Sequence, residues 1–382
     1  MKRASLVFLL LGFALLPGTA FSAPAPEPAA GAPPAAPGPV RREKKPTGIE
    51  IVSRLEPPAR PGGFRPEDLA GYVLVYFKDE PHCAYLAISR DGFTFTDVNG
   101  GEPVFEGEIL AEQKGVRDPH LARGPDGAFY LAMTDLHIFG DRAGFRTTRW
   151  QRPEEKYGWG NNRALVLMKS WDLIHWTHSD FRVDLAFPEL GDIDSAWAPE
   201  TTYDPVKKKM MVYFTIRYGN KNANIYYAYA DDAFTRLETT PRMIPHIGGI
   251  DGDLTHVGDK WHLFYVGGAK ILHAVSADIT QGFVAESRRI DPESKPTEAP
   301  NVFRRLGTDT YVLMYDVYGA RPNNMGFSET TDFVTFRDIG HFNEGVMRGT
   351  NFERPKHGAV THLTPDELKP VAAHWHVPIK LD

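Results

Sequence analysis

The chain has 382 residues, with 31 prolines, 35 glycines, a single cysteine and a formal net charge of −6. A mildly acidic chain lacks the basic surface that a nucleic-acid-binding protein needs. The lone Cys83 excludes an internal disulfide framework.

The first 22 residues, MKRASLVFLLLGFALLPGTAFS, combine a basic start, an apolar run and small residues near the end. This order is typical of a secretory signal peptide. A transmembrane anchor needs about 20 apolar residues, whereas this run has about 13. We therefore expect an exported protein, periplasmic or extracellular, with no membrane span. Residues 23–47 are rich in Pro and Ala, which is typical of an extended, disordered linker.

Three sequence motifs each occur five times after this linker and predict one large domain over residues 48–382. The first is an apolar, aromatic run of strand length: YVLVYF from 72, FYLAMT from 129, MMVYFT from 210, WHLFYV from 261 and YVLMYD from 311. The second follows each run and reads as strand, Asp-containing turn, strand, as in ALVLMKSWDLIHWT from 164. The third precedes the runs: RDPHLA at 117, WAPETTY at 197, IDGDLTHV at 250, EAPNVFRR at 298 and HGAVTHL at 357.

The order of the motifs is circularly offset. No apolar run follows the motif at 357, and the run that should do so lies near the N-terminus, at residue 72. A ring of four-stranded blades is often closed in this way, because closure protects the sheet edges. The pattern predicts an all-β, five-bladed β-propeller closed by N- and C-terminal strands in one blade. A β-sandwich predicts neither the fixed order nor the offset.

The third motif identifies the candidate site. The first strand of each propeller blade lines the central channel, so the mouth should carry Asp118, Trp197, Asp251, Glu298 and His357. Carboxylates held close together repel each other, and the pKa of at least one must rise. Glycoside hydrolysis needs such a set, with a protonated acid, a carboxylate base and an aromatic ring that can stack on a sugar.

These motifs, in this order over residues 65–375, resemble those of glycoside hydrolase family 43. The resemblance implies that Asp118 is the general base, that Asp251 tunes the pKa of the acid, and that Glu298 protonates the leaving oxygen. Family members usually have Asp-Pro at the second of these positions, where this chain has Asp251-Gly252. Asp253, on the same face of the strand, is the alternative for that role.

Other residues are candidates for binding the substrate. Arg117 and His120 flank Asp118 in its motif, and Trp159 and Asn161 lie in the long insertion 137–163. Long loops in compact domains are usually functional, although this one could equally be a packing flap. The ring of Trp197 could stack on a sugar or pack in the core.

His357 could bind substrate or be a structural histidine. We expect no metal ligand set and no required cofactor; the resemblance allows a structural Ca²⁺ in the central channel near His357.

The sequence thus predicts an exported, monomeric, inverting glycoside hydrolase whose only partner is a carbohydrate. The resemblance implies a plant-type substrate, α-L-arabinofuranoside first and β-D-xyloside or galactoside next. Two alternatives stay open. One is a retaining fructan- or sucrose-type hydrolase, although its Asn-Asp-Pro nucleophile strand is not found here. The other is a non-catalytic carbohydrate-binding propeller.

Overall fold

The computed structural model describes residues 48–58, 65–140, 142–145, 152–320 and 325–379. The described residues belong to one compact unit, Lys45–Asp382. The predicted signal peptide and linker lie outside them. Among the described helices, none combines the length and the apolar character needed to cross a membrane.

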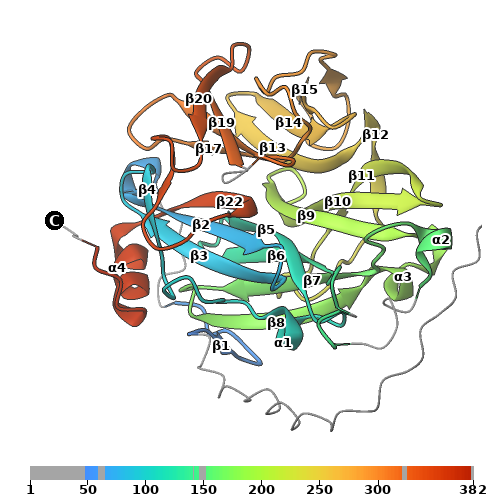
Figure 1. Cartoon of the computed structure of the whole chain (residues 1–382), viewed down its shortest axis with the longest axis horizontal. Helices are drawn as coiled ribbons and strands as arrows, with labels where there is room; N and C mark the ends of the chain where they lie inside the picture. Colours follow the sequence, from blue (N-terminus) through green and yellow to red (C-terminus); the bar gives the residue numbers. More distant parts are fainter. Residues whose placement is uncertain (1–47, 59–64, 141, 146–151, 321–324, 380–382) are drawn as a thin grey trace, which may run out of the picture. The chain divides into compact units, whose positions relative to one another are not determined.

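Five sheets of antiparallel strands follow the predicted repeat (Figure 1). From the channel outward, the first sheet consists of β5 (Val116–Arg123), β6 (Phe129–Asp135), β7 (Ala164–Ser170) and β8 (His175–Arg182), and the second of β9 (Ser195–Asp204), β10 (Lys209–Tyr218), β11 (Lys221–Tyr229) and β12 (Arg242–Gly248). The third sheet consists of β13 (Ile250–Val257), β14 (Lys260–Val266), β15 (Ile271–Ser276) and β16 (Val284–Ala285), and the fourth of β17 (Thr297–Arg304), β18 (Tyr311–Val317), β19 (Met325–Thr330) and β20 (Arg337–His341). The fifth sheet consists of β22 (Lys356–Leu363), β2 (Gly71–Lys78), β3 (Cys83–Ser89) and β4 (Thr94–Asp97). The innermost strands contact one another in the cyclic order β5, β9, β13, β17, β22. The prediction of a five-bladed propeller is confirmed.

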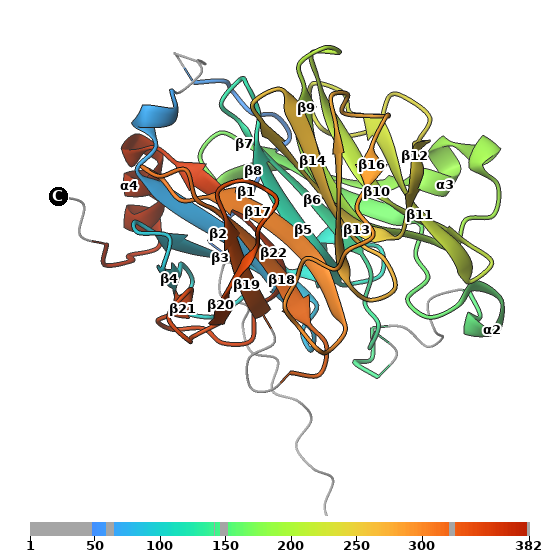
Figure 2. The same cartoon turned by 90° about the horizontal axis from the view of Figure 1, so that it is seen from above.

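Strands from both ends of the domain close the ring. β22 pairs antiparallel with β2, and Figure 1 shows the red C-terminal strand beside the blue N-terminal one. Two short strands extend the outer edges: β1 (Glu50–Ile51) pairs with β8, and β21 (Arg348–Gly349) pairs with β4, both in parallel. Helix α4 (Pro365–His374) packs on β2, on the opposite side of the ring from α2 (Glu154–Tyr157) and α3 (Val183–Ala186) (Figure 2). Helix α1 (Gly107–Leu110) precedes β5.

The apolar runs form the second strand of each blade and are buried on both faces. In β10, Met211 and Tyr213 join the cluster shared with the β13–β16 blade, whereas Val212 and Phe214 join the cluster shared with the β5–β8 blade. Five such clusters lie between successive blades. Successive side chains of a strand point to opposite faces of its sheet. Because each blade packs between two neighbouring blades, both faces of these strands are buried and their sequence is continuously apolar.

The Asp-containing turns join the third and fourth strands. In the turn after β7, Asp172 Oδ1 accepts hydrogen bonds from the backbone N–H groups of Ile174 and His175, at 2.9 and 2.8 Å. Asp91 and Asp332 make the same pair of contacts in their blades. A side chain that mimics a backbone acceptor fixes the turn, which explains why Asp recurs there. The predicted position of the fourth strand was wrong in three blades. The second motif, read as IYYAYADDAFTRL from 225, ILHAVSADITQGF from 271 and NMGFSETTDFVTF from 324, ends before β12, β16 and β20 begin.

Gly358 offers a direct test of the ring closure. A Cβ atom on Gly358 would lie 2.2 Å from the backbone carbonyl oxygen of Val75 in β2. We expect Gly358→Ala to lower the free energy of unfolding by about 1–3 kcal/mol, because two paired backbones must separate. Gly248→Ala is the matched control, because its nearest neighbour, Asn224 Oδ1, lies at an ordinary 3.7 Å. Equal melting temperatures for the two variants would contradict this closure.

Candidate active site

Every innermost strand contains an irregularity at the same place. The pairing register shifts once in each of β5, β9, β13, β17 and β22. At each shift one residue has a positive φ: Asp118 (50°), Ala198 (44°), Asp251 (50°), Ala299 (57°) and His357 (32°). A Pro or Gly follows each of them. Bulges of this kind bend a strand and redirect its side chains, and they are frequent next to active sites.

This repeat refines the alignment of the five mouth residues. Asp118, Asp251 and His357 occupy the left-handed position itself, whereas Trp197 and Glu298 come one residue earlier. The five side chains therefore do not occupy equivalent positions. Three lie on the bulge and two lie one residue before it.

Hydrogen bonds from four of the five bulges join successive blades. The bulge N–H of one blade donates to a side chain of the preceding blade: Ala198 N to Thr134 Oγ1 at 2.8 Å, Asp251 N to Thr215 Oγ1 at 3.2 Å, Ala299 N to Asp251 Oδ2 at 3.2 Å, and His357 N to Asp316 Oδ1 at 3.2 Å. The backbone N–H of each of these bulge residues is therefore bound by the preceding blade rather than by its own sheet.

Asp118 is partly buried and surrounded by donors and positive charge. Thr134 Oγ1 donates to its Oδ2 at 2.9 Å, and its Oδ1 lies 3.2 Å from His357 Nδ1 and 3.9 Å from Arg117 Nε. Burial favours the neutral acid, but the charge and hydrogen bond of His357, together with Arg117 and Thr134, hold the pKa of Asp118 well below its ordinary value. Asp118 is therefore a carboxylate at neutral pH.

The pKa values of His357 and Asp251 are raised, whereas that of Asp118 is lowered. Burial disfavours the imidazolium, but the negative charges of Asp118, Asp251 and Asp316 raise the pKa of His357 to about 9. Burial raises the pKa of Asp251 to about 7; His357 opposes this rise, and the charges of Glu298 and Asp118 add to it. Two aspartates in equivalent bulges thus differ in protonation.

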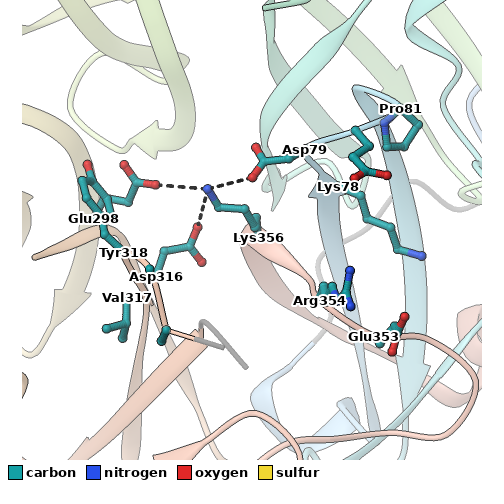
Figure 3. Close-up of a pocket in the computed structure, with 13 residues that line it drawn as sticks. Lys78, Asp79, Pro81, Glu298, Asp316, Val317, Tyr318, Glu353, Arg354 and Lys356 are labelled. Carbon is teal, nitrogen blue, oxygen red and sulfur yellow. Dashed lines mark hydrogen bonds and ion pairs between the residues drawn. The ribbon is translucent and has the colours of Figure 1, made fainter. Parts of the chain in front are cut away.

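Glu298 shares a cation with two other acids. Lys356 Nζ lies 3.4 Å from Glu298 Oε1, 3.3 Å from Asp79 Oδ2 and 3.9 Å from Asp316 Oδ2 (Figure 3). Tyr318 also lies on this wall; partial burial and the charge of Glu298 raise its pKa. These groups line a cavity of about 390 Å³, which is within the range of small-molecule sites.

A second layer of polar residues lies two positions beyond the bulges. It consists of His120, Glu200, Asp253 and Asn301. Asp253 accepts hydrogen bonds from Asn301 Nδ2 at 3.0 Å and from the N–H of Val302 at 3.1 Å, whereas Asp251 interacts with Glu298 and Asp118. Asp251, rather than its alternative, is thus the aspartate in electrostatic contact with both Glu298 and Asp118.

The cluster His120, Glu200 and Asp253 is close enough to be tested as a metal site. The N–H of Thr201 donates to His120 Nδ1 at 3.1 Å, so the neutral ring carries its own proton on Nε2. Burial lowers the pKa of His120 to about 3, which keeps the ring neutral. Nε2, 3.8 Å from Glu200 Oε2, therefore has no lone pair for a cation. This donor set does not fit a metal.

The channel near His357 was the other expected ion site. His357 Nδ1 faces Asp118, and no group of three potential ligand residues among the described residues includes His357. The side chains around His357 therefore do not make a direct ligand set for Ca²⁺, and no step below is routed through a metal.

The remaining candidates lie around the insertion, of which residues 141 and 146–151 are outside the described residues. Trp197 donates from Nε1 to Gly160 O at 2.8 Å, and the Arg217 guanidinium lies 4.3 Å from the centre of its ring. Trp159 is 54% exposed and meets Trp197 edge-on at 6.4 Å. Asn161 is buried, and its amide nitrogen donates to Gly158 O. Of these side chains, Trp159 is the one open to solvent.

Arg117 is buried against β2. Its Nη1 lies 3.2 Å from Asp79 Oδ1, and its guanidinium stacks on Phe77 at 4.6 Å. The same side chain reaches Asp118 through Nε. Arg117 thus links the base candidate to the acidic group around Lys356.

Comparisons with known proteins bear on the family to which the chain belongs. A family model related to glycosyl hydrolase family 43, described as "Probable glycosyl hydrolase domain", matches residues 67–369. The chain belongs to this glycosyl hydrolase family. The family assignment made from the motifs is confirmed. No curated protein sequence matches the hydrolase.

Several solved structures are similar to the hydrolase at low sequence identity. The family 43 protein BlXynB of Bacillus licheniformis is 13% identical over 76% of the hydrolase and 58% of that chain, with a TM-score of 0.47. A Xanthomonas citri family 43 enzyme complexed with xylose is 15% identical over 59% and 73%, with a TM-score of 0.42. An exo-β-1,3-galactanase of Clostridium thermocellum is 13% identical over 62% and 50%, with a TM-score of 0.42.

Sequence reasoning missed Thr134, Asp316 and Lys356. Thr134 and Asp316 are the sixth residues of their apolar runs, where Thr215 stands in a third run. A polar residue closing an apolar run was thus a readable signal for a group at the channel mouth. Lys356 directly precedes the histidine motif, but its three carboxylate partners come from separate segments.

The ion pair of Asp118 with His357 predicts a pH-dependent stability. The pKa of His357 is raised on folding, so the stabilisation it provides is complete below about pH 6.5 and is lost as pH rises through about 9. The difference in unfolding free energy between wild type and His357→Gln should therefore shrink from pH 6 to pH 10 in denaturant titrations.

His120→Gln is the control for this experiment. His120 is already neutral in the folded protein, so its difference from wild type should stay constant between pH 7 and pH 10. A His357 difference that does not change with pH would show that the ring is uncharged.

Proposed function

We propose that this hydrolase is an exported, inverting glycosidase that uses Glu298 as the general acid and Asp118 as the general base. The observation that carries the proposal is the contrast at the channel mouth. Asp118 is held ionised by His357 and Arg117, and Glu298 lies nearby on the wall of a ligand-sized cavity. An ionised carboxylate can accept a proton from water, and a second carboxyl group at the same mouth can supply one to the leaving oxygen.

In the proposed reaction, the substrate binds with its scissile oxygen at Glu298. Asp118 accepts a proton from a water molecule as that water attacks the anomeric carbon from the opposite face. Glu298 gives its proton to the departing oxygen, so no covalent intermediate forms. The imidazolium of His357 keeps Asp118 oriented, because its Nδ1 is fixed 3.2 Å from Oδ1.

Asp251 has the tuning role in this proposal. It interacts electrostatically with both Glu298 and Asp118, and it is fixed by the N–H of Ala299, the residue after Glu298. Any negative charge that Asp251 carries favours the protonated form of a neighbouring acid. Lys356 and Tyr318 hold the carboxyl group of Glu298 in place.

The cavity supports a position for the leaving group. Glu298 and Tyr318 line it, together with Lys356, Asp316, Asp79 and Arg354, but Asp118 does not. Because the acid touches the leaving oxygen and the base touches the opposite side, we place the leaving part of the substrate in this cavity. Trp159, exposed at the insertion, is the proposed stacking residue.

The sugar and the location are proposed from the sequence. The motifs resemble those of family 43, for which α-L-arabinofuranosides come first and β-D-xylosides or galactosides next. Export to the periplasm or the cell exterior is proposed from the order of basic, apolar and small residues at the N-terminus. We propose a monomer with a carbohydrate as its only partner.

The acid and base roles predict different responses to the leaving group. Asp118→Asn should lower kcat by at least about 10²-fold on every substrate, because no group then activates water. Glu298→Gln should cause a similar loss on natural glycosides. It should keep much more activity on dinitrophenyl glycosides, whose leaving group needs no proton. Initial rates on matched glycosides measure both effects.

The same rates separate Asp251 from its alternative and the enzyme from a binding protein. Asp251→Asn should move the alkaline limb of the pH–rate profile, whereas Asp253→Asn should leave that limb in place. If wild type, Asp118→Asn and Glu298→Gln were equally inactive yet bound sugar, the chain would be a non-catalytic carbohydrate-binding propeller.

The inverting course is tested by the first-formed product. With nitrophenyl α-L-arabinofuranoside, β-D-xyloside and galactosides as a first screen, ¹H NMR within minutes of mixing identifies the anomer released from the best substrate. We expect the anomer opposite to that of the substrate. A product with retained configuration would instead favour the fructan- or sucrose-type mechanism with a covalent intermediate.

A further inference from the structure

A second group of carboxylates lies away from the channel mouth, at the edge of the β5–β8 blade. It consists of Glu112, in the segment between α1 and β5; Asp135, the last residue of β6; and Asp180, in β8. One ligand atom from each lies within 4.8 Å of the other two. We call these three residues the outer carboxylate cluster. None of them takes part in the proposed reaction.

Two oxygens of the outer carboxylate cluster are buried without a hydrogen-bond donor. Asp135 is fully buried; its Oδ1 accepts from the N–H of Gln113 at 2.9 Å, but its Oδ2 has no partner. Asp180 Oδ2 accepts from the N–H of Glu112 at 2.8 Å, but its Oδ1 has no partner. A buried carboxylate oxygen left without a partner is costly, so both atoms call for a positively charged or donating ligand.

The protein supplies only part of the positive charge needed. Arg182 Nη1 lies 3.0 Å from Glu112 Oε2, and the same guanidinium also binds Asp184 at 2.9 Å. That pairing leaves the two aspartates to repel each other.

The geometry and the donor type select the ligand. Carboxylate oxygens favour hard cations such as Ca²⁺ and Mg²⁺ over metals that prefer nitrogen or sulfur. Ca²⁺ accepts six to eight oxygens in flexible geometry, whereas Mg²⁺ demands a near-ideal octahedron and gives up its waters reluctantly. A site of three carboxylates from three separate segments therefore suits the larger ion better.

We propose that the outer carboxylate cluster is a calcium site, with Asp135 Oδ2, Asp180 Oδ1 and Glu112 as its protein ligands. The ion would sit where the two unpartnered oxygens meet the third carboxylate. Both aspartates already hold the backbone of residues 112 and 113, so the bound ion fixes the segment that leads into β5. That strand carries Asp118. The site is separate from the channel ion expected near His357, which shares none of these ligands.

The test uses the full chain, dialysed against a chelator, and does not depend on activity. Calorimetric titration with CaCl₂ at pH 7 should show one site, and Mg²⁺ should bind at least about tenfold more weakly. At a hundredfold excess of Ca²⁺ over its Kd, the melting temperature should rise by about 3–8 °C.

Asp180→Asn provides the decisive variant. The amide removes one negative charge, so the calcium-free variant should melt above calcium-free wild type, yet its Ca²⁺ affinity should fall at least about tenfold. Glu112→Gln gives a second, more exposed substitution in the same site should Asp180→Asn fold poorly. Asp309→Asn, an exposed aspartate, is the matched control and should respond to Ca²⁺ as wild type does.

Two results would overturn the proposal. The first is no heat and no melting shift with Ca²⁺ in wild type, which would show that the three carboxylates bind no calcium. The second is a calcium shift that persists in Asp180→Asn and Glu112→Gln but disappears in His357→Gln, which would place the ion in the channel instead.

Discussion

The kink in each innermost strand is the constraint on which the rest of the structure depends. It turns one residue per blade into the left-handed region, and in four blades the N–H of that residue is bound by a side chain of the preceding blade. The same kink directs Asp118, Asp251 and His357 toward one another across the channel. The strained backbone, the contact with the preceding blade and the convergence of charged groups therefore all arise from the same kink, which is repeated around the ring.

Charge placement then divides nearly equivalent acids into different roles. Asp118 and Asp251 share a bulge position and are both largely shielded from solvent, yet His357 and Arg117 contact only the first directly. Asp118 therefore stays ionised, whereas burial brings the pKa of Asp251, like that of Asp316, to about 7. Identical side chains acquire different chemistry because the blades bring different neighbours to them.

Much of this arrangement could be predicted from the sequence, because each repeated motif corresponds to a strand that pairs with the strands next to it in the chain. The order of the motifs and the displaced run at residue 72 predicted the blades and their closure, since strand pairing follows hydrophobic pattern. Ion pairs between blades leave no such mark. The pairing of Lys356 with Glu298, Asp79 and Asp316 joins segments far apart in the chain. The late start of β12 also escaped prediction, because an irregular segment precedes it.

The protonation of the aspartates at the channel mouth is the central claim, and carboxyl titration measures it most directly. In protein labelled with ¹³C at aspartate side chains, assigned by Asp118→Asn and Asp251→Asn, we expect Asp118 to remain ionised at pH values below its ordinary pKa. Asp251 should titrate near pH 7. Two aspartates titrating together near pH 4 would contradict the account, because the mouth would then hold no ionised base beside a protonated neighbour.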